Sequence, residues 1–548
     1  MADESTTQVL SRQLLSADHW VSPQARYTVK DLVRLYNLPE EYDGTGQKIG
    51  ILLPSAGLDA SDLEEYFSAL GIRYRPPTIV EVGKAKNSPC KREDLRRFLL
   101  SIGAGYEGTC RAEFRRPDNS PMPVRPEGME AGSALFEQIT FTLEAIADVE
   151  IAGATAPGAE LRVYVCENSA DGIAEAIERA VQDGVVSICT SWGVDENPPL
   201  ALPFVTKIND ALRAAAKAGV TCCCASGDTG ARPGFKERTP PLAVSFPASS
   251  PFALACGGTT IVSDDGGIPK EIVWNETHFT FDGASGGGFS QVNNCPSWQF
   301  SRRAPRKKDR GDAHLGKGGK RGVPDVAGNA GGSSGMWLRV AGLNAISFGT
   351  SSVSPFYAGL IARLTQALGG KPRFMPPLFY QPSVRETFRS VTSGTNVKRN
   401  LGTEYSAQPG WDACTGLGTP DGVALLRALS ALPEAVAPDL DDEPPAGPPK
   451  PKLIREDLLI VADDGQIYFV PEAEWKHAVV DTHEEQWLAE ELLSRGVALA
   501  AIPEPAEGVP DFGKQSGDSE DPRVGALIAC YLVNISGLRK RTPFVRRG

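Results

Sequence analysis

The chain has 548 residues, of which 41% are hydrophobic and 23% charged, so it can bury a large core and is not of disordered composition. With 56 basic against 68 acidic residues, its net charge of -12 disfavours nucleic acid and anionic membranes as partners. No apolar run is long enough to span a bilayer, and residues 1–26 lack the pattern of a secretory signal. The eleven cysteines include no Cys-x-x-Cys pair, so we expect reduced thiols in a cytoplasmic protein.

After a polar lead-in at residues 1–26, residues 27–432 alternate short apolar runs with helical patterns. The apolar runs are bounded by turn residues and predict buried parallel strands at 49–54, 160–165, 185–192 and 220–226. Helical periodicity that ends in glycine predicts helices at 169–184 and 204–219. This alternation predicts an α/β fold with a doubly wound, mostly parallel sheet, whose functional groups lie at the carboxyl ends of its strands.

Three other segments stand apart from this alternation. Residues 85–135 mix basic and acidic side chains, and we expect a solvated surface excursion with one short helix. Residues 433–452 are rich in proline and acid, which predicts an extended linker. Residues 453–548 predict a small C-terminal α+β domain of unknown role, with strand-like runs at 458–470 and 524–535 and a helix at 484–496.

Residues 347–364, SFGTSSVSPFYAGLIARL, place Ser351 just before an apolar helical run. Backbone N–H groups and the positive end of the helix dipole would lie beside its hydroxyl, an arrangement that suits a nucleophile whose reaction develops an oxyanion. The alternative is an ordinary helix cap.

A serine nucleophile needs a base, and none of the histidines is in the His-Gly-Thr setting of subtilisins. The first strand ends in Leu53-Pro54, where a subtilisin would have its aspartate. The chain has five histidines, at positions 19, 278, 314, 477 and 483.

Carboxylates offer another base. Glu144 and Asp148 are four residues apart, so on a helix they share one face, and apolar neighbours predict that the segment is buried. Two such carboxyls would share a proton, with Glu144 accepting the serine proton while Asp148 supports it. A solvated acidic stripe is the alternative.

Asp228 follows an apolar strand within SGDTG and supplies a third carboxyl. If it is buried and protonated, it can donate a hydrogen bond to an oxyanion, together with the backbone N–H of Ser351. The alternative is an Asx turn that closes the strand.

Taken together, these segments resemble the sedolisin family of serine-carboxyl peptidases, and most closely its kumamolisin-like members. Besides Glu144 and Asp148, the motifs that carry the resemblance occur in family order: DVEIAGATAPGAEL (148–161), TSWG (190–193), SGDTG (226–230), ACGGTTI (255–261), SGGGFS (285–290), RGVPDVAGNA (321–330), GTSSVSP (349–355) and GWDACTGLGTP (410–420). The resemblance implies a subtilisin-like fold, endopeptidase activity, and a Ser351–Glu144–Asp148 triad with Asp228 at the oxyanion.

The same resemblance implies further sites. Trp192 and Gly286, Gly287 and Gly288 match positions that line the family's substrate cleft. A calcium site is implied at Asp412 and the carbonyls of Val391, Gln408 and Gly410, although Ser390 replaces the family's first aspartate and should weaken binding. The family's long propeptide is not matched by the short lead-in, and Leu53 aligns with a glutamate of some relatives.

We therefore expect a serine-type endopeptidase that acts on peptides or proteins through an acyl-enzyme, without nucleic acid or membrane. Residues 453–548 suggest a dedicated intracellular substrate or partner. Two alternatives remain open: a catalytically silent scaffold or binding protein with the same fold, and an enzyme that transfers the acyl group to an amine.

Overall fold

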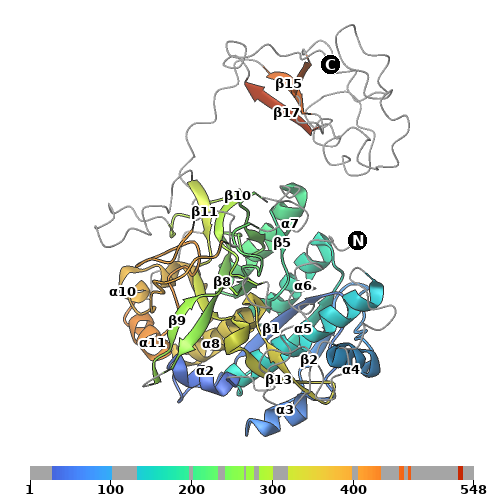
Figure 1. The fold of residues 1–548 in the computed structure, drawn as a ribbon, viewed down its shortest axis with the longest axis vertical. Helices are drawn as coiled ribbons and strands as arrows, with labels where there is room; N and C mark the ends of the chain where they lie inside the picture. The colour runs from blue at the N-terminus through green and yellow to red at the C-terminus, as the bar shows by residue number, and fades with distance from the viewer. Residues whose placement is uncertain are drawn as a thin grey trace, which may run out of the picture. The chain divides into compact units, whose positions relative to one another are not determined.

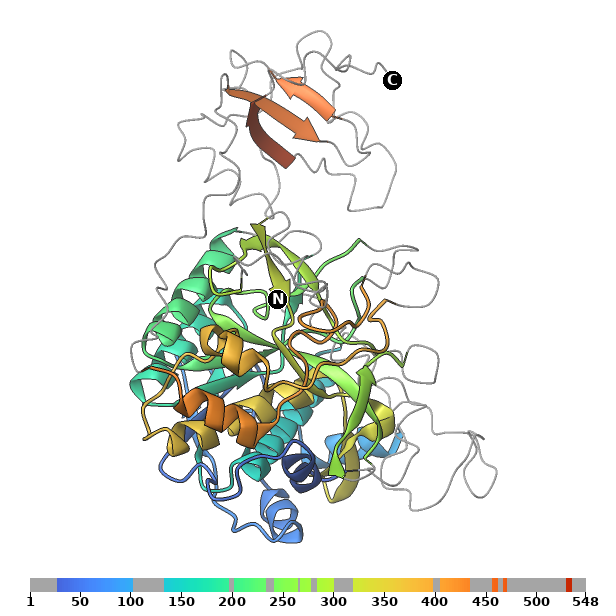
Figure 2. The same ribbon diagram turned by 90° about the vertical axis from the view of Figure 1, so that its left-hand side faces the viewer.

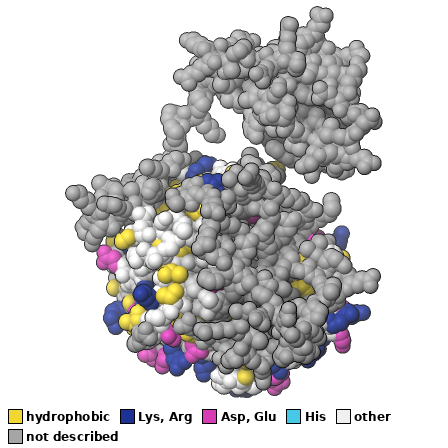
Figure 3. Space-filling view, in the orientation of Figure 1, with side chains coloured by type: hydrophobic (Ala, Val, Ile, Leu, Met, Phe, Trp, Pro, Cys, Tyr) yellow, Lys and Arg dark blue, Asp and Glu magenta, His cyan; other side chains and the backbone are white. Residues whose placement is uncertain are grey.

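A computed structural model describes residues 27–101, 133–196, 202–232, 241–264, 267–276, 283–299, 319–397 and 405–433, together with three strands further along the chain. The chain divides into two compact units, residues 1–445 and 446–548. Within the described ranges, no helix has the length and apolar character needed to cross a membrane. Lys and Arg side chains are interspersed with Asp and Glu on the visible face of the first unit (Figure 3).

The first unit is built on an eight-stranded sheet (Figure 1). Seven strands run in the order β12-β8-β6-β4-β1-β3-β2 and are parallel, and β9 pairs antiparallel with β8. Their bounds are β1 Lys48–Pro54, β2 Thr78–Glu81, β3 Glu160–Cys166, β4 Ser187–Thr190, β6 Thr221–Ala225, β8 Ala253–Ser263, β9 Lys270–Val273 and β12 Val326–Asn329. The four predicted strands are β1, β3, β4 and β6, neighbours in this sheet, so the α/β prediction is confirmed.

Helices cover both faces of the sheet (Figure 2). On one face lie α5 (Ala134–Thr155) and α8 (Val353–Ala367), which carry mostly buried residues. The other face is covered by α6 (Ala170–Gln182), capped by the Ser169 hydroxyl, and by α7 (Leu202–Lys217). The predicted helices at 169–184 and 204–219 correspond to α6 and α7.

The remaining elements frame this core. The other helices are α2 (Val29–Leu35), α3 (Leu63–Ala69), α4 (Arg92–Ser101), α9 (Pro376–Phe379), α10 (Pro382–Arg385) and α11 (Gly422–Ser430), with 3-10 turns η4 (Gly332–Ser334) and η5 (Thr350–Ser352). Two-stranded pairs join β5 (Val194–Asp195) to β7 (Ser245–Phe246), β10 (Gly288–Asn294) to β11 (Lys320–Val323), and β13 (Met336–Val340) to β14 (Leu343–Ser347). In the second unit, β15 (Glu456–Val461) pairs antiparallel with β16 (Ile467–Val470) and β17 (Ala529–Asn534). The helix predicted at 484–496 lies outside the described residues.

The prediction of a solvated excursion at 85–135 is wrong for α4. Leu95, Phe98 and Leu99 have no exposed surface, and the Phe98 ring packs edge-on against Phe136 of α5 with centroids 5.8 Å apart. These three residues have the spacing of one helix face, so they form a buried stripe beneath the charged face of the same helix. Residues 102–132 are outside the described part of the chain.

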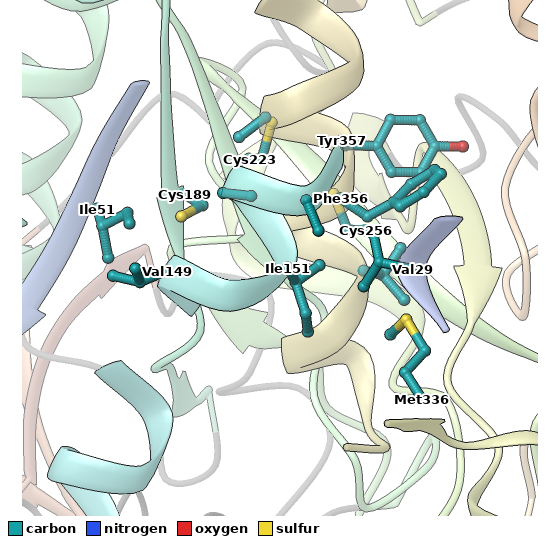
Figure 4. Packing of buried hydrophobic residues seen from close by; sticks show 14 of the residues in the cluster. Val29, Ile51, Val149, Ile151, Cys189, Cys223, Cys256, Met336, Phe356 and Tyr357 are labelled. Carbon is teal, nitrogen blue, oxygen red and sulfur yellow. The ribbon is translucent and has the colours of Figure 1, made fainter. Parts of the chain in front are cut away.

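Cysteines form part of the core between the sheet and helices α5 and α8. Cys189, Cys223 and Cys256 come from the neighbouring strands β4, β6 and β8 and pack near Val149 and Phe356 (Figure 4). All nine cysteines whose side chains are described are free and buried, where they act as small apolar groups.

Helices α5 and α8 approach each other closely at Gly359. A Cβ placed on Gly359 would lie 2.6 Å from the Thr155 Cβ, a distance that packed carbon atoms do not tolerate. The two helices therefore depend on the missing side chain for their spacing, and they carry the residues discussed next.

Replacing this glycine tests the close approach. We expect Gly359→Ala to destabilise the first unit by about 1–3 kcal/mol, because the added methyl forces the helices apart. Thermal unfolding measures the loss. Adding Thr155→Gly should restore part of it, since it removes the opposing Cβ. Equal losses in the single and double variants would contradict the close-approach explanation.

Candidate active site

Ser351 lies in the 3-10 turn η5 that leads into α8, as the sequence predicts, and 6% of its surface is exposed. The next turn fixes this helix end to the sheet. The Ser354 hydroxyl donates to the Cys223 carbonyl at 2.8 Å and accepts the Thr190 N–H at 3.2 Å. The nucleophile candidate is thus held above the carboxyl ends of β4 and β6.

Glu144 and Asp148 lie on α5, one turn apart, and face the same site. The Ser191 hydroxyl donates to Asp148 Oδ1 at 2.6 Å and lies 3.1 Å from the Ser351 carbonyl oxygen. Glu144 and Ser351 line one pocket. The Ser351 hydroxyl itself lies 3.4 Å from the Ser191 carbonyl oxygen.

Burial dominates the protonation of this pair. It raises the pKa of Glu144 to about 8, with the charge of Asp228 adding to the rise and hydrogen bonds from the Ser351 and Ser191 hydroxyls opposing it. The Asp148 pKa is also raised well above its ordinary value, first by burial and then by the charge of Glu144. Glu144 Oε1 is buried without a hydrogen-bond partner among the described residues. A carboxylate left in this state takes up a proton readily, which is the property of a base.

Asp228 follows β6 and is hydrogen-bonded to Thr350, the residue that directly precedes Ser351. Its Oδ1 accepts both the N–H and the hydroxyl of Thr350, each at 2.7 Å. Thr350 Oγ1 in turn accepts the Gly227 N–H at 3.1 Å. Burial raises the pKa of Asp228 to about 6, against these stabilising hydrogen bonds. With Oδ1 occupied, a proton on Oδ2 leaves the carboxyl able to donate.

The predicted substrate-binding residues are buried. Trp192 is 4% exposed and packs in the core on the α6 and α7 side of the sheet, and its Nε1 has no partner among the described residues. Gly286 donates its N–H to the Gly227 carbonyl at 2.7 Å, and a Cβ there would lie 2.1 Å from the Ser226 carbonyl oxygen. Gly287 and Gly288 are buried beside it. In this structure the glycine run supports the loop that carries Asp228.

The residues predicted to bind calcium fit that ion poorly. Asp412 is the one carboxylate among them, and its oxygens accept the N–H groups of Gln408, Cys414 and Thr415 together with the Thr415 hydroxyl, at 2.8–3.3 Å. These donors occupy the lone pairs that a cation would need.

The other predicted ligands add no charge. Ser390 is exposed, Val391 is buried, and Gly410 and Gln408 are partly buried. Among the described residues, no group of three or more His, Cys, Asp or Glu side chains could hold a metal.

The sequence alone did not assign a role to two residues of the site. Ser191 was noted only as part of TSWG, yet its hydroxyl lies between Asp148 and Ser351. Thr350 was noted only as part of GTSSVSP, yet it connects Asp228 to η5, the turn that contains Ser351. A usable signal existed for Ser191, because it lies at the end of the predicted strand 185–192, whose carboxyl end was expected to face the site.

Comparisons with known proteins agree with this architecture. The model of the subtilase family matches residues 142–403. The solved structure of Pseudomonas sedolisin, a serine-carboxyl proteinase complexed with two molecules of pseudo-iodotyrostatin, superposes with a TM-score of 0.57 at 24% identity, covering 74% of this chain and 98% of that one. The fold is therefore that of the subtilisin-like α/β proteins.

The sequence comparisons point to a narrower group of relatives than the fold does. Kumamolisin of Bacillus sp. (strain MN-32) is 37% identical over 414 residues, which is 75% of this chain and 64% of kumamolisin. Sedolisin of Pseudomonas sp. (strain 101) is 32% identical over 49% of this chain and 45% of its own length. The chain thus spans less than two thirds of either relative. Over its matched residues it is similar to the sedolisin family, kumamolisin in particular.

The raised pKa of Glu144 predicts a stability effect. A carboxyl whose folded-state pKa exceeds its unfolded value contributes stability below pH 4.5 that is lost as pH rises through about 8. We therefore expect Glu144→Gln to be about 1–3 kcal/mol more stable than the wild type at pH 8.5, with little difference at pH 4, by thermal unfolding. Glu178→Gln, at an exposed position on α6, is the matched control. A Glu144→Gln protein that is less stable than the wild type at pH 8.5 would contradict the raised pKa of Glu144.

Proposed function

We propose that this protein is a serine-type endopeptidase that hydrolyses peptide bonds through an acyl-enzyme. The observation that carries the proposal is the convergence of three carboxyls on one serine, with Asp148 and Asp228 buried and Glu144 half-buried. Glu144 shares a pocket with Ser351, Asp148 is joined to Ser351 through Ser191, and Asp228 is joined through Thr350. Similarity to kumamolisin and sedolisin supports the same activity.

In the first half-reaction, Ser351 Oγ attacks the peptide carbonyl carbon and gives its proton to ionised Glu144. Asp148, held by the Ser191 hydroxyl, supports the Glu144 carboxyl. Protonated Asp228 and the Ser351 N–H donate hydrogen bonds to the oxyanion of the tetrahedral intermediate. The intermediate collapses when Glu144 returns the proton to the leaving nitrogen, and the new amine departs.

In the second half-reaction, a water molecule replaces the amine. Glu144 takes a proton from the water molecule while the water oxygen attacks the ester carbonyl. The same donors hold the second oxyanion. Collapse breaks the ester bond, releases the new carboxyl terminus, and returns the proton to Ser351 Oγ. No step passes through calcium, because the Asp412 oxygens are occupied by protein donors.

The substrate is a peptide or protein, and we propose a dedicated cytoplasmic substrate or partner for residues 453–548. The nine free cysteines of the described residues support a reducing compartment. The positions of Gly286 and its neighbours, packed against the Asp228 loop, support a role in fixing the cleft wall rather than in direct contact.

Removing the nucleophile tests the activity. We expect the wild type to degrade casein between pH 3 and 8 and Ser351→Ala to lose at least about 1,000-fold in rate, because no acyl-enzyme can form. A fluorophosphonate followed by mass spectrometry should label Ser351 in the wild type. Ser352→Ala, at the adjacent hydroxyl bonded to Ser347, is the matched control and should stay labelled at Ser351.

The outcomes separate the alternatives. Degradation that persists in Ser351→Ala would remove the proposed nucleophile. Folded wild type that neither labels nor degrades casein at any pH would favour the scaffold. Products that carry an added amine would identify acyl transfer.

The pH profile tests Asp228. Glu144 must be ionised and Asp228 protonated, while their pKa values are about 8 and about 6, so the rate should be greatest between these values. At that maximum, on the order of one molecule in a hundred is in the competent state. In Asp228→Asn the amide donates at every pH, so the fall on the alkaline side should disappear while the rate at the optimum drops about 10- to 100-fold.

The matched control is Asp412→Asn, which alters another buried carboxyl whose pKa is also raised to about 6. Its normalised kcat/KM profile should keep the alkaline fall. An unchanged alkaline limb in Asp228→Asn would assign that limb to another group.

A further inference from the structure

An apolar pocket adjoins Glu144 and Ser351 and has no part in the proton transfers described above. Its empty space is about 480 Å³, open solvent at its mouth included. Glu144 is the one charged side chain among its lining residues. The apolar walls include Leu99, Leu143, Leu338, Val340, Ala345 and Phe348.

The walls are built from three separate elements. Leu99 comes from α4, Leu143 from α5, and most of the remainder from the hairpin β13–β14. In the hairpin, Leu338 pairs with Ala345, and both are buried, whereas the alternating Arg339 and Asn344 are more exposed. The pleat of the hairpin therefore directs one apolar face toward the pocket.

Partly buried hydrogen bonds hold the hairpin in place. Asp62 Oδ2 accepts the Gly342 N–H at 2.7 Å, and Arg96 donates to the Ala341 carbonyl at 2.9 Å. Further along, Glu150 of α5 accepts the Arg339 N–H at 3.0 Å. The turn of the hairpin and the adjacent end of β13 are thus tied to α4 and α5, which complete the pocket, so the space is formed before a substrate arrives.

The chemistry decides which part of a substrate reaches this pocket. Glu144 returns its proton to the leaving nitrogen, so the chain that departs as an amine must pass beside Glu144. Asp228, which holds the oxyanion, does not line the pocket, and neither do Ser191 and Trp192. The pocket therefore lies on the leaving-group side of Ser351.

We propose that this pocket receives a large apolar side chain, such as leucine, from the residue that directly follows the scissile bond. The inference rests on the proposed peptidase function. Filling the pocket also removes water from around Glu144 at the moment of proton transfer, which strengthens the electrostatic interactions there. Selectivity of about 10- to 100-fold follows from burying one such side chain instead of a small one.

The test uses internally quenched peptides that are identical except for Leu, Ala or Asp after the cleaved bond, located by mass spectrometry. We expect kcat/KM to be about 10- to 100-fold higher with Leu than with Ala, and lower still with Asp. Ala345→Leu fills the pocket and should reduce kcat/KM for the Leu peptide at least about tenfold, while the Ala peptide changes by less than about threefold. Asn344→Ala, on the opposite face of the same strand, is the matched control and should keep the Leu preference.

Two measurements distinguish a wrong assignment of the pocket from a protein that lacks peptidase activity. Fluorophosphonate labelling of Ala345→Leu reports whether its nucleophile is intact, independently of peptide turnover. Binding of the same peptides to Ser351→Ala by fluorescence anisotropy reads the pocket without turnover, and Leu should again bind more tightly unless Ala345→Leu is added. Equal affinities for Leu and Asp, or an equal loss for the Leu and Ala peptides in Ala345→Leu, would overturn the proposal whether or not the protein cleaves peptides.

Discussion

The gathering of three largely desolvated carboxyl groups around one hydroxyl is the constraint on which the candidate site depends. Charged carboxylates are unfavourable in an apolar interior, so the fold has to supply either protons or hydrogen-bond donors to each of them. Asp148 receives the Ser191 hydroxyl and Asp228 receives two groups of Thr350, whereas one oxygen of Glu144 receives no partner among the described residues. The least satisfied carboxyl is therefore the one that lies beside the nucleophile.

Such an arrangement is kept only if the surrounding frame is rigid. Helix α8 meets α5 at Gly359, where no side chain separates them, and Ser354 ties the first turn of α8 to strands β4 and β6. A mobile helix end would let water reach the carboxyls and return their pKa values toward those in solution. Close packing behind the site is thus needed to maintain the unusual protonation states within it.

Much of the fold and part of the site were predictable from sequence, for identifiable reasons. The central strands are short apolar runs bounded by turn residues, and Glu144 and Asp148 have a spacing that a helix brings onto one face, one turn apart. Ser191 was missed because its role arises where the end of β4 meets α5, a contact between segments 43 residues apart. Helix α4 was misjudged because its charged residues outnumber the apolar stripe that buries it. The calcium prediction followed a motif, whereas hydrogen bonds from nearby residues decide what Asp412 can bind.

The order of the site residues along the chain has a consequence for biosynthesis. Glu144, Asp148 and Asp228 are translated before Ser351, and Ser351 is in place only when α8 has emerged and docked on β4 and β6. A nascent chain that ends before α8 has the acids but no hydroxyl for them to activate. Under the proposed mechanism, a ribosome-bound intermediate that ends before α8 cannot form an acyl-enzyme, because the complete site exists only after Ser351 has been added.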